Sequence, residues 1–272
     1  MRTVSILLVM LVFFSSRIAL ACGADSDCRV IDGSYRVRLP PSPAERPFGA
    51  ILFFHGWQQT AEDVMNDQAL AAVAARLGVA LVALNGEQKT WSFPSSPHHY
   101  RDDFKYVHTV LEDIGERFPI DRSRIIGAGF SQGASMLWYL ACRQPRLFAA
   151  FAPVSGAFWR PAPRTCTAPL PVLLHLHGVA DATVPLKGRE DAPGVRQDSV
   201  RDSFGILGPS APLQKLPRVR SGFIGETPLT CERSARRRDG GLLELCLHAG
   251  GHQFIAAWIE HAWHLSAERR SR

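Results

Sequence analysis

The feature that most constrains this chain is a repeated alternation between short apolar runs and segments with helical periodicity. The apolar runs are of strand length and lack polar alternation, as in strands buried on both faces of a parallel sheet. They cover residues 50–54, 79–84, 125–130, 148–154, 172–176 and 242–247. Between them, apolar side chains recur every three to four residues, near 65–77, 104–118, 136–140 and 254–262. Strand alternating with helix predicts an α/β fold with a doubly wound, mostly parallel sheet.

Two segments depart from this alternation. Residues 35–39 alternate between apolar and polar, which predicts a half-buried strand before the first run. Residues 186–235 are rich in Gly, Pro and Arg and show little periodicity. We expect them to form an irregular insertion over one edge of the sheet, or a cap, because long loops of this kind usually carry function or move.

The N-terminal segment is typical of a secretory signal peptide. Arg2 precedes an apolar run at 4–14, which is shorter than the ~20 residues that span a bilayer, and small residues end at Ala21. We expect a signal peptide at 1–21, a single domain at 22–272, and a secreted or periplasmic protein with no stable membrane insertion after cleavage. A lipid anchor on Cys22 is the less favoured alternative, because Ala19 stands where lipoprotein signals usually have a bulky aliphatic residue.

All six cysteines follow the expected cleavage point. An even number of cysteines in an exported chain favours disulfides over metal ligands, although six cysteines allow 15 pairings. Order along the chain favours three local pairs: Cys22–Cys28, Cys142–Cys166 and Cys231–Cys246. No metal site is expected, because the sequence has no C-x-x-C and no His pair at ligand spacing from a cysteine.

Composition excludes several classes of protein. Hydrophobic residues make up 46% and charged residues 21% of the chain, as in ordinary globular proteins rather than disordered or fibrous ones. The formal net charge of +6 includes two arginines of the expected signal peptide. The remaining excess is small and scattered, so we expect no nucleic-acid partner.

The strongest motif is Gly129-Phe130-Ser131-Gln132-Gly133. A G-x-S-x-G string alone is weak evidence, but here it lies between a buried strand and an amphipathic helix, where a nucleophile elbow needs it. Its tight turn requires the two glycines, and the backbone N–H of Gln132 would face developing negative charge. The alternative is a glycine-rich turn in which Ser131 caps the helix.

Ser131 needs a base, and the base needs a carboxylate that orients it. In hydrolases of this architecture the acid and then the histidine follow the serine, each just past a strand end. Asp181 and His252 occupy those places, although they could also be a turn acid and a helix cap. The rival bases and acids, which fit the order or the strand ends less well, are His248, His261, His264, Asp121, Asp191, Asp198 and Asp202.

His55-Gly56-Trp57 closes the first buried run and marks the usual second source of an oxyanion N–H, here the backbone of Trp57. The ring of Trp57 is expected to line the substrate pocket, whereas His55 is expected to fix the loop through its ring nitrogens. Trp91, past the end of 79–84, is expected either to contact substrate as an exposed side chain or to anchor its loop. Asp103 is expected in the first turn of the next helix.

Together these residues resemble the secreted α/β-hydrolase family of polyhydroxybutyrate depolymerases and feruloyl esterases. The likeness covers nearly all of the chain after the signal: the Cys-rich start, His55-Gly56-Trp57-Gln58, Trp91, Asp102-Asp103-Phe104, Gly129–Gly133, His177-Gly178-Val179-Ala180-Asp181 and Gly250-Gly251-His252. The resemblance implies a cofactor-free carboxylic-ester hydrolase with Ser131, Asp181 and His252 as its triad. Ala134 departs from the second glycine of many relatives. Because the chain ends soon after its last helix, we expect oligomers or small soluble esters rather than solid polymer.

The first expectation for the substrate is therefore a hydroxybutyrate oligomer or a similar short-chain ester. A feruloyl or acetyl esterase acting on plant cell-wall polysaccharide is the main alternative, because Trp57, Trp91 and Trp159 could stack an aromatic acyl group as well as line an aliphatic slot. A non-catalytic binding protein of the same fold is a further alternative, which the intact Ser-Asp-His set disfavours.

Overall fold

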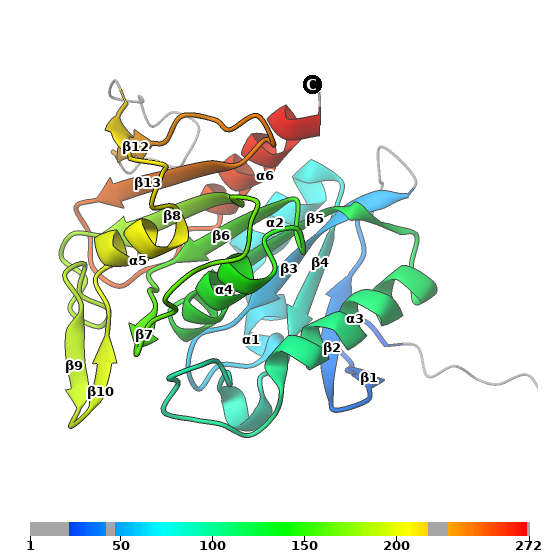
Figure 1. Cartoon of the computed structure of the whole chain (residues 1–272). Coiled ribbons are helices and arrows are strands. Elements are labelled where there is room, and N and C mark those ends of the chain that lie inside the picture. Colours follow the sequence, from blue (N-terminus) through cyan, green and yellow to red (C-terminus); the bar gives the residue numbers. More distant parts are fainter. Residues whose placement is uncertain (1–21, 42–46, 217–227, 271–272) are drawn as a thin grey trace, which may run out of the picture.

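A ten-stranded sheet runs through the protein and is covered by helices on both faces (Figure 1). The computed structural model describes residues 22–41, 47–216 and 228–270, so the expected signal peptide at 1–21 lies outside the described residues. In spatial order the strands are β1 (Cys28–Val30), β2 (Gly33–Arg38), β4 (Ala80–Leu84), β3 (Phe48–Phe54), β5 (Ile120–Phe130), β6 (Ala150–Val154), β8 (Val172–Gly178), β13 (Leu242–His248), β12 (Thr230–Arg233) and β11 (Gln214–Lys215).

The six central strands, β4, β3, β5, β6, β8 and β13, are parallel, and the strands toward both edges are antiparallel. Each of the six apolar runs in the sequence falls on one of these central strands. All seven residues of β3 and of β8 are buried, as expected for strands covered on both faces. The doubly wound, mostly parallel sheet expected from the sequence is confirmed.

Helices α3 (Asp103–Arg117), α4 (Gln132–Arg143) and α5 (Val200–Leu207) bury their apolar sides in the core on one face of the sheet. On the other face lie α1 (Ala61–Asn66), α2 (Gln68–Leu77) and α6 (Ala257–Arg270) (Figure 1). The single helix expected near 65–77 is two helices, because the Asp67 carboxylate accepts from the Leu70 N–H and starts α2. Helix α6 begins later than expected, after Phe254 and Ile255.

The insertion expected at 186–235 is present, but most of its described part forms regular strands and a helix rather than an irregular segment. Strands β9 (Arg189–Ala192) and β10 (Val195–Gln197) form a hairpin that pairs with β7 (Trp159–Arg160) in a small antiparallel sheet. Helix α5 follows directly, and β11 and β12 extend the main sheet beyond β13. Residues 217–227 lie outside the described part. The hairpin projects from the molecule beside β7 (Figure 1).

The structure pairs the cysteines as chain order favoured: Cys22–Cys28, Cys142–Cys166 and Cys231–Cys246. The last pair joins register partners on β12 and β13. Its two sulfurs, which lie near the Glu244 carboxylate, are bonded to each other and so are not thiolate ligands for a metal.

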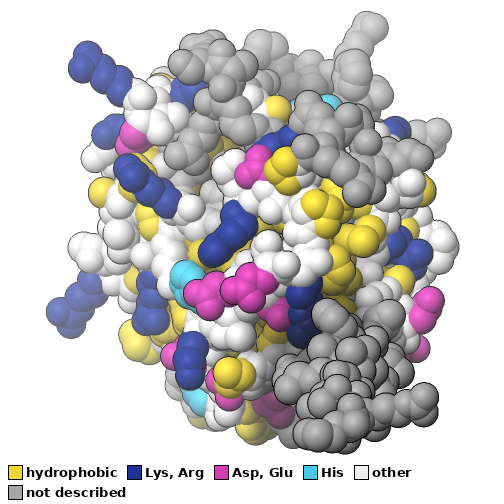
Figure 2. All heavy atoms as spheres, turned by 90° about the vertical axis from the view of Figure 1, so that its right-hand side faces the viewer, with side chains coloured by type: hydrophobic (Ala, Val, Ile, Leu, Met, Phe, Trp, Pro, Cys, Tyr) yellow, Lys and Arg dark blue, Asp and Glu magenta, His cyan; other side chains and the backbone are white. Residues whose placement is uncertain are grey.

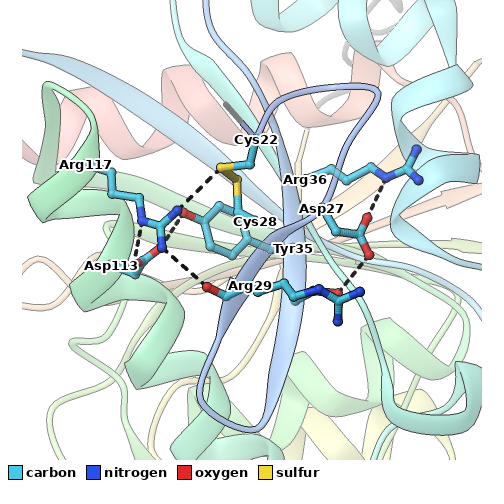
Figure 3. Close-up of a disulfide and its surroundings, with 9 residues drawn as sticks. Cys22, Asp27, Cys28, Arg29, Tyr35, Arg36, Asp113 and Arg117 are labelled. Atoms are coloured by element: carbon cyan, nitrogen blue, oxygen red, sulfur yellow. Dashed lines mark hydrogen bonds and ion pairs between the residues drawn. A yellow bond between two sulfur atoms is a disulfide. The ribbon is translucent and has the colours of Figure 1, made fainter. Parts of the chain in front are cut away.

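The first disulfide joins the start of the described chain to β1, beside α3 (Figure 3). The Arg117 guanidinium lies 3.6 Å from the Cys22 sulfur and donates to the Arg29 carbonyl at 3.3 Å. Asp113 links this arginine to the sheet, because its carboxylate accepts from Arg117 at 2.8 Å and from the Tyr35 hydroxyl at 2.6 Å. A partly exposed polar network therefore holds the first strands against α3, and the disulfide ties Cys22 to β1.

Within the described residues, no helix has both the length and the apolar character needed to cross a membrane. On the face shown in Figure 2, basic and acidic side chains are interspersed, with hydrophobic side chains lying singly or in small groups between them.

Candidate active site

Ser131 lies in the turn between β5 and α4, in a conformation that few residues adopt. Its φ is +56° and its ψ is −117°, and its N–H donates to the Val154 carbonyl at 2.9 Å. Gly133 permits this turn, because a Cβ there would collide with the backbone oxygens of Phe54, at the end of β3, and of His55 just after it. Backbone strain of this kind concentrates at functional sites, and here it lifts the serine hydroxyl clear of the strand end.

Three side chains from the carboxyl ends of three strands form one hydrogen-bonded line. The Ser131 hydroxyl lies 3.0 Å from His252 Nε2, and His252 Nδ1 lies 2.8 Å from Asp181 Oδ2. The carboxylate fixes Nδ1 as the protonated nitrogen, so Nε2 is free to accept the serine proton. The structure thus brings together the serine, base and acid that the sequence singled out.

Asp181 is almost fully buried yet ionised. Burial alone would raise the pKa of its carboxyl group, but the hydrogen bonds from His252 and from the Val184 N–H lower the pKa below its ordinary value. Its second oxygen accepts from the N–H groups of Thr183 and Val184, at 2.9 and 2.7 Å. The carboxylate is therefore held in one orientation, with one oxygen left for the histidine.

The acid loop and the histidine loop are joined through their backbones. The Val179 N–H donates to the His248 carbonyl at 2.9 Å, and the Ala180 N–H donates to the Gly250 carbonyl at 3.2 Å. Gly178 allows this approach, since a Cβ there would strike the carbonyl oxygens of Gly250 and Gly251. The ring of His252 also packs against Phe130, with centroids 4.6 Å apart. These contacts explain how two loops far apart in the sequence reach hydrogen-bonding distance.

Two residues beside the Ser131 pocket, Trp57 and Gln132, carry backbone N–H groups without an acceptor in the described chain. The end of β3 is beside the end of β5, with Phe54 and Gly129 in register, so the Trp57 loop adjoins the serine turn. In the described part of the chain neither the Trp57 N–H nor the Gln132 N–H donates to any acceptor. The Thr90 hydroxyl holds the Gln132 side chain at 2.8 Å. Both residues line the pocket at Ser131.

His55 supports the loop through both ring nitrogens. Nδ1 lies 2.8 Å from the Gly56 carbonyl, and Nε2 accepts from the Gly86 N–H at 3.0 Å. Burial lowers the pKa of His55 to about 4, so its ring is neutral near pH 7. The structural role expected for this residue matches these contacts.

The expectation that Trp91 is exposed at the pocket mouth was wrong. The side chain is fully buried, its Nε1–H donates to the His55 carbonyl at 2.8 Å, and its ring packs against Phe54 and His55. An indole with a buried N–H needs such an acceptor, and the His55 carbonyl supplies it. Trp91 therefore anchors its loop, which was the alternative to substrate contact, and it does not line the pocket.

The acid next to this loop is also structural. Asp103, in the first turn of α3, is completely buried, accepts from the Ser92 N–H at 2.6 Å and pairs with Arg101 at 2.5 Å. Asp102 caps the same helix by accepting from the Lys105 N–H.

Three of the rival bases and acids, His248, His261 and Asp198, are engaged elsewhere. His248 is buried at the end of β13, where Nδ1 accepts from the Gly250 N–H at 3.1 Å, and His261 lies 3.2 Å from the buried carboxylate of Glu244. Asp198 pairs with Arg160 at 2.8 Å. None of these groups is hydrogen-bonded to Ser131.

A pocket of about 530 Å³ opens beside Ser131. The side chains of Trp57, Phe130 and Trp159 line this pocket with aromatic rings, and that of Trp57 is 60% exposed. The sequence did not reveal several further residues that line this pocket. The β9–β10 hairpin and neighbouring loops contribute His98, Thr183, Arg189, Asp191 and Gln197, and α4 contributes Ser135. The dipeptide Pro193-Gly194 is a turn signal between two short polar strands and could have indicated the hairpin.

Comparison with known proteins agrees with this geometry. A family model described as phospholipase/carboxylesterase matches residues 41–211. NocK of Nocardia uniformis subsp. tsuyamanensis, named as an esterase, is 32% identical over 169 residues, which are 59% of this chain and 48% of NocK. A probable feruloyl esterase C of Aspergillus flavus is 24% identical over 169 residues, 59% of each chain. The chain thus spans about half the length of the curated relatives it matches.

Among solved structures, the acetyl xylan esterase from Aspergillus awamori is similar with a TM-score of 0.59, covering 86% of this chain and 94% of that one at 14% identity. At this identity the likeness concerns the fold. The α/β-hydrolase fold expected from the motifs is confirmed, with a mixed, mostly parallel sheet and a small antiparallel sheet as its insertion.

Proposed function

The chain belongs to the phospholipase/carboxylesterase family, and from that membership we propose that it hydrolyses small soluble or oligomeric carboxylic esters through an acyl-enzyme on Ser131. The observation that carries the proposal is the line of hydrogen bonds from Ser131 through His252 to Asp181. Each of the three residues stands at the carboxyl end of a different parallel strand or just beyond it, where this fold builds its active sites.

In the proposed reaction, His252 Nε2 takes the hydroxyl proton of Ser131 as Oγ attacks the ester carbonyl. The tetrahedral intermediate collapses when the C–O bond to the alcohol breaks, and His252 donates the proton to the leaving alkoxide. A water molecule, deprotonated by His252 in its turn, attacks the acyl-enzyme and releases the carboxylic acid and the free serine. Asp181 keeps the imidazole oriented and stabilises its charged form throughout.

The oxyanion of each intermediate would accept from the N–H groups of Trp57 and Gln132. This role is supported by the lack of another acceptor for either group in the described chain and by the position of Gln132 at the first turn of α4, where the helix dipole favours negative charge. Removing one such donor typically costs about 3 kcal/mol in the transition state.

Two substrate classes follow from the sequence, and one of them has more support. Aromatic walls at Trp57, Phe130 and Trp159 suit a flat acyl group, and a relative carries the name feruloyl esterase C. We therefore favour a feruloyl-type or acetyl ester of a plant polysaccharide as the substrate. Hydroxybutyrate oligomers are the competing class, for which the aromatic walls offer no distinctive contact.

We further propose that the protein is exported after removal of residues 1–21 and acts as one catalytic domain, 22–272. Three disulfides support an oxidising compartment, outside the cell or in a periplasm. The disulfide between Cys22 and Cys28 disfavours a lipid anchor on Cys22, because a lipid-modified sulfur could not form it.

A panel of p-nitrophenyl and methyl esters with acyl groups of graded length, including methyl ferulate and a hydroxybutyrate trimer, tests the proposal. We expect turnover by the wild type and a loss of about six orders of magnitude in Ser131→Ala, with the circular dichroism spectrum unchanged. A Ser131→Ala variant that retains a tenth of the wild-type rate would reject the role. No turnover of any ester, and no reaction with a fluorophosphonate, would favour a non-catalytic binding protein.

A further inference from the structure

One wall of the active-site pocket is a row of side chains across the small antiparallel sheet. Gln197 on β10 is in register with Trp159 on β7 and with Arg189 on β9. Residues directly opposite each other in antiparallel strands project from the same face, and all three of these residues line the pocket. We propose that Gln197 and Arg189 recognise a neutral hydroxyl group on the substrate. This inference rests on the proposed esterase function, because that group belongs to the ester bound at Ser131.

Gln197 supplies an acceptor that has no partner. Its side chain is 2% exposed, and its Oε1 is buried without a hydrogen bond from any described residue. Buried amide oxygens in folded proteins are nearly always hydrogen-bonded, because leaving one unpaired forfeits its hydration without compensation. An unpaired acceptor in a substrate pocket is therefore suited to a donor on the substrate.

Arg189 supplies the matching donor from the neighbouring strand. Its Nε is buried and also lacks a partner, while its Nη2 lies 2.7 Å from the Asp191 carboxylate. Asp191, exposed at the tip of the same strand, compensates the charge of the guanidinium. The wall therefore offers a donor and an acceptor side by side with little net charge.

This combination selects among the groups that an ester could carry. A carboxylate would face the Asp191 carboxylate and the Gln197 oxygen, which both repel it. An ether or carbonyl could accept from Arg189 but would leave Gln197 unpaired, and an ammonium group would be repelled by Arg189. A hydroxyl group donates to Gln197 and accepts from Arg189 at once, so it satisfies both atoms.

A hydroxyl group of this kind could come from two sources. The ring of a hydroxycinnamoyl group would pack against Trp159 and direct a phenolic hydroxyl along the row toward Gln197. A hydroxybutyryl chain would carry an aliphatic hydroxyl into the same place. The recognition chemistry is shared, and matched substrates separate the two sources.

The test compares kcat/KM within two substrate pairs, methyl 4-hydroxycinnamate against methyl cinnamate and methyl 3-hydroxybutyrate against methyl butyrate. We expect the wild type to prefer the hydroxyl-bearing member of at least one pair by about tenfold or more, because a site built to bond a hydroxyl discriminates against the analogue that lacks it. The pair that shows the preference identifies the source.

Gln197→Met and Arg189→Met should each bring that preference down to within about twofold of unity, because each removes one of the two bonds. Gln197→Leu serves as a second apolar variant if Gln197→Met does not fold. The matched control is Arg196→Met, on the same strand but with its exposed side chain outside the pocket, and it should keep the wild-type preference.

Calorimetric titration of Ser131→Ala with the same four esters separates this inference from the proposed function. If no ester is hydrolysed but the hydroxyl-bearing ester still binds about tenfold tighter, the esterase assignment fails and the recognition stands. Equal kcat/KM and equal binding within both pairs, or a preference that persists in Gln197→Met and Arg189→Met, would overturn the inference.

Discussion

His252 Nε2 lies 3.0 Å from Ser131 Oγ, although 121 residues separate the two in the chain. The parallel sheet explains this proximity, because the carboxyl ends of β5 and β13 open on the same edge with β6 and β8 between them. The loop after β8 then brings Asp181 to the far side of the imidazole ring, 2.8 Å away.

Asp181→Asn should lower kcat by about three to four orders of magnitude while the protein stays folded. Asparagine can still accept from the Thr183 and Val184 N–H groups, so the loop keeps its backbone bonds. What is lost is the negative charge that fixes the His252 tautomer and stabilises its charged form. Steady-state turnover of p-nitrophenyl acetate, with thermal unfolding measured in parallel, checks this.

The control for that change is Asp202→Asn, an acid at the exposed start of α5. It should keep turnover within about twofold of wild type, because surface substitutions rarely alter function or stability. Equal losses in the two variants would show that Asp181 has no special role.

Trp91→Phe should lower stability without changing substrate affinity. The substitution removes the indole donor to the His55 carbonyl and leaves a cavity in the core, so we expect the free energy of unfolding to fall by about 2–4 kcal/mol. KM for short esters should stay within about twofold, since Trp91 does not line the pocket. Urea unfolding and steady-state kinetics measure the two effects.

Trp57→Ala should give the opposite pattern. Its ring is 60% exposed and lines the pocket, so truncation should change the free energy of unfolding by less than about 0.5 kcal/mol while lowering kcat/KM for aromatic esters roughly tenfold. If Trp57→Ala unfolds the protein and Trp91→Phe abolishes binding, the two tryptophans have been assigned the wrong way round.

The Cys142–Cys166 disulfide should contribute more to stability than Cys22–Cys28. It closes a loop with a sequence separation of 24 residues, against 6 for the first disulfide. From loop-closure entropy, we expect the free energy of unfolding to fall by about 3.5 kcal/mol when Cys142 and Cys166 are replaced by serines. The same replacement of Cys22 and Cys28 should cost about 2.4 kcal/mol. Chemical denaturation of the two double variants compares them, and a larger loss for Cys22–Cys28 would contradict the prediction.

Stability should decline as pH falls from about 6.5 to 4. Burial lowers the pKa of His55 to about 4, and burial also lowers the pKa of His175 and His177, whose rings are 3.0 Å apart at their nearest nitrogens. An ordinary histidine in the unfolded chain has a pKa of about 6.5, so the unfolded state takes up protons first as the pH drops. The folded state therefore has its full stability above about pH 6.5 and loses it as the pH falls toward the pKa of the folded histidines. For His55 alone, the free energy of unfolding should fall by about 3 kcal/mol.

Urea unfolding at several pH values between 7.5 and 4.5 measures this dependence. His55→Asn should flatten the slope, and His99→Asn, at an exposed site, controls for the loss of a histidine. A free energy of unfolding that is equal at pH 7 and pH 5 would contradict the assignment of neutral, buried histidines.

The central strands and the three aligned side chains were predictable from the sequence for physical reasons. A strand buried on both faces must be apolar throughout, so the runs that became β3, β5 and β8 stand out. The turn at Ser131 needs glycine where Gly133 meets the backbone of β3, so its motif is equally visible.

Features that depend on long-range contacts were harder to predict from the sequence. Trp91 follows a strand end like a pocket residue, and only its neighbours reveal that its indole points inward to the His55 carbonyl. The β9–β10 hairpin has short, exposed and polar strands, so no hydrophobic alternation marked it. Gln197 and Arg189 become pocket residues only through the register that aligns them with Trp159.

The most direct test of the central claim is to map by mass spectrometry where a fluorophosphonate reacts with the folded protein. The account predicts one adduct, on the peptide containing Ser131, formed rapidly in the wild type and at least a hundredfold more slowly in His252→Ala, because the serine hydroxyl is a poor nucleophile without its base. Labelling at another residue, or labelling of Ser131 at an undiminished rate without His252, would contradict it.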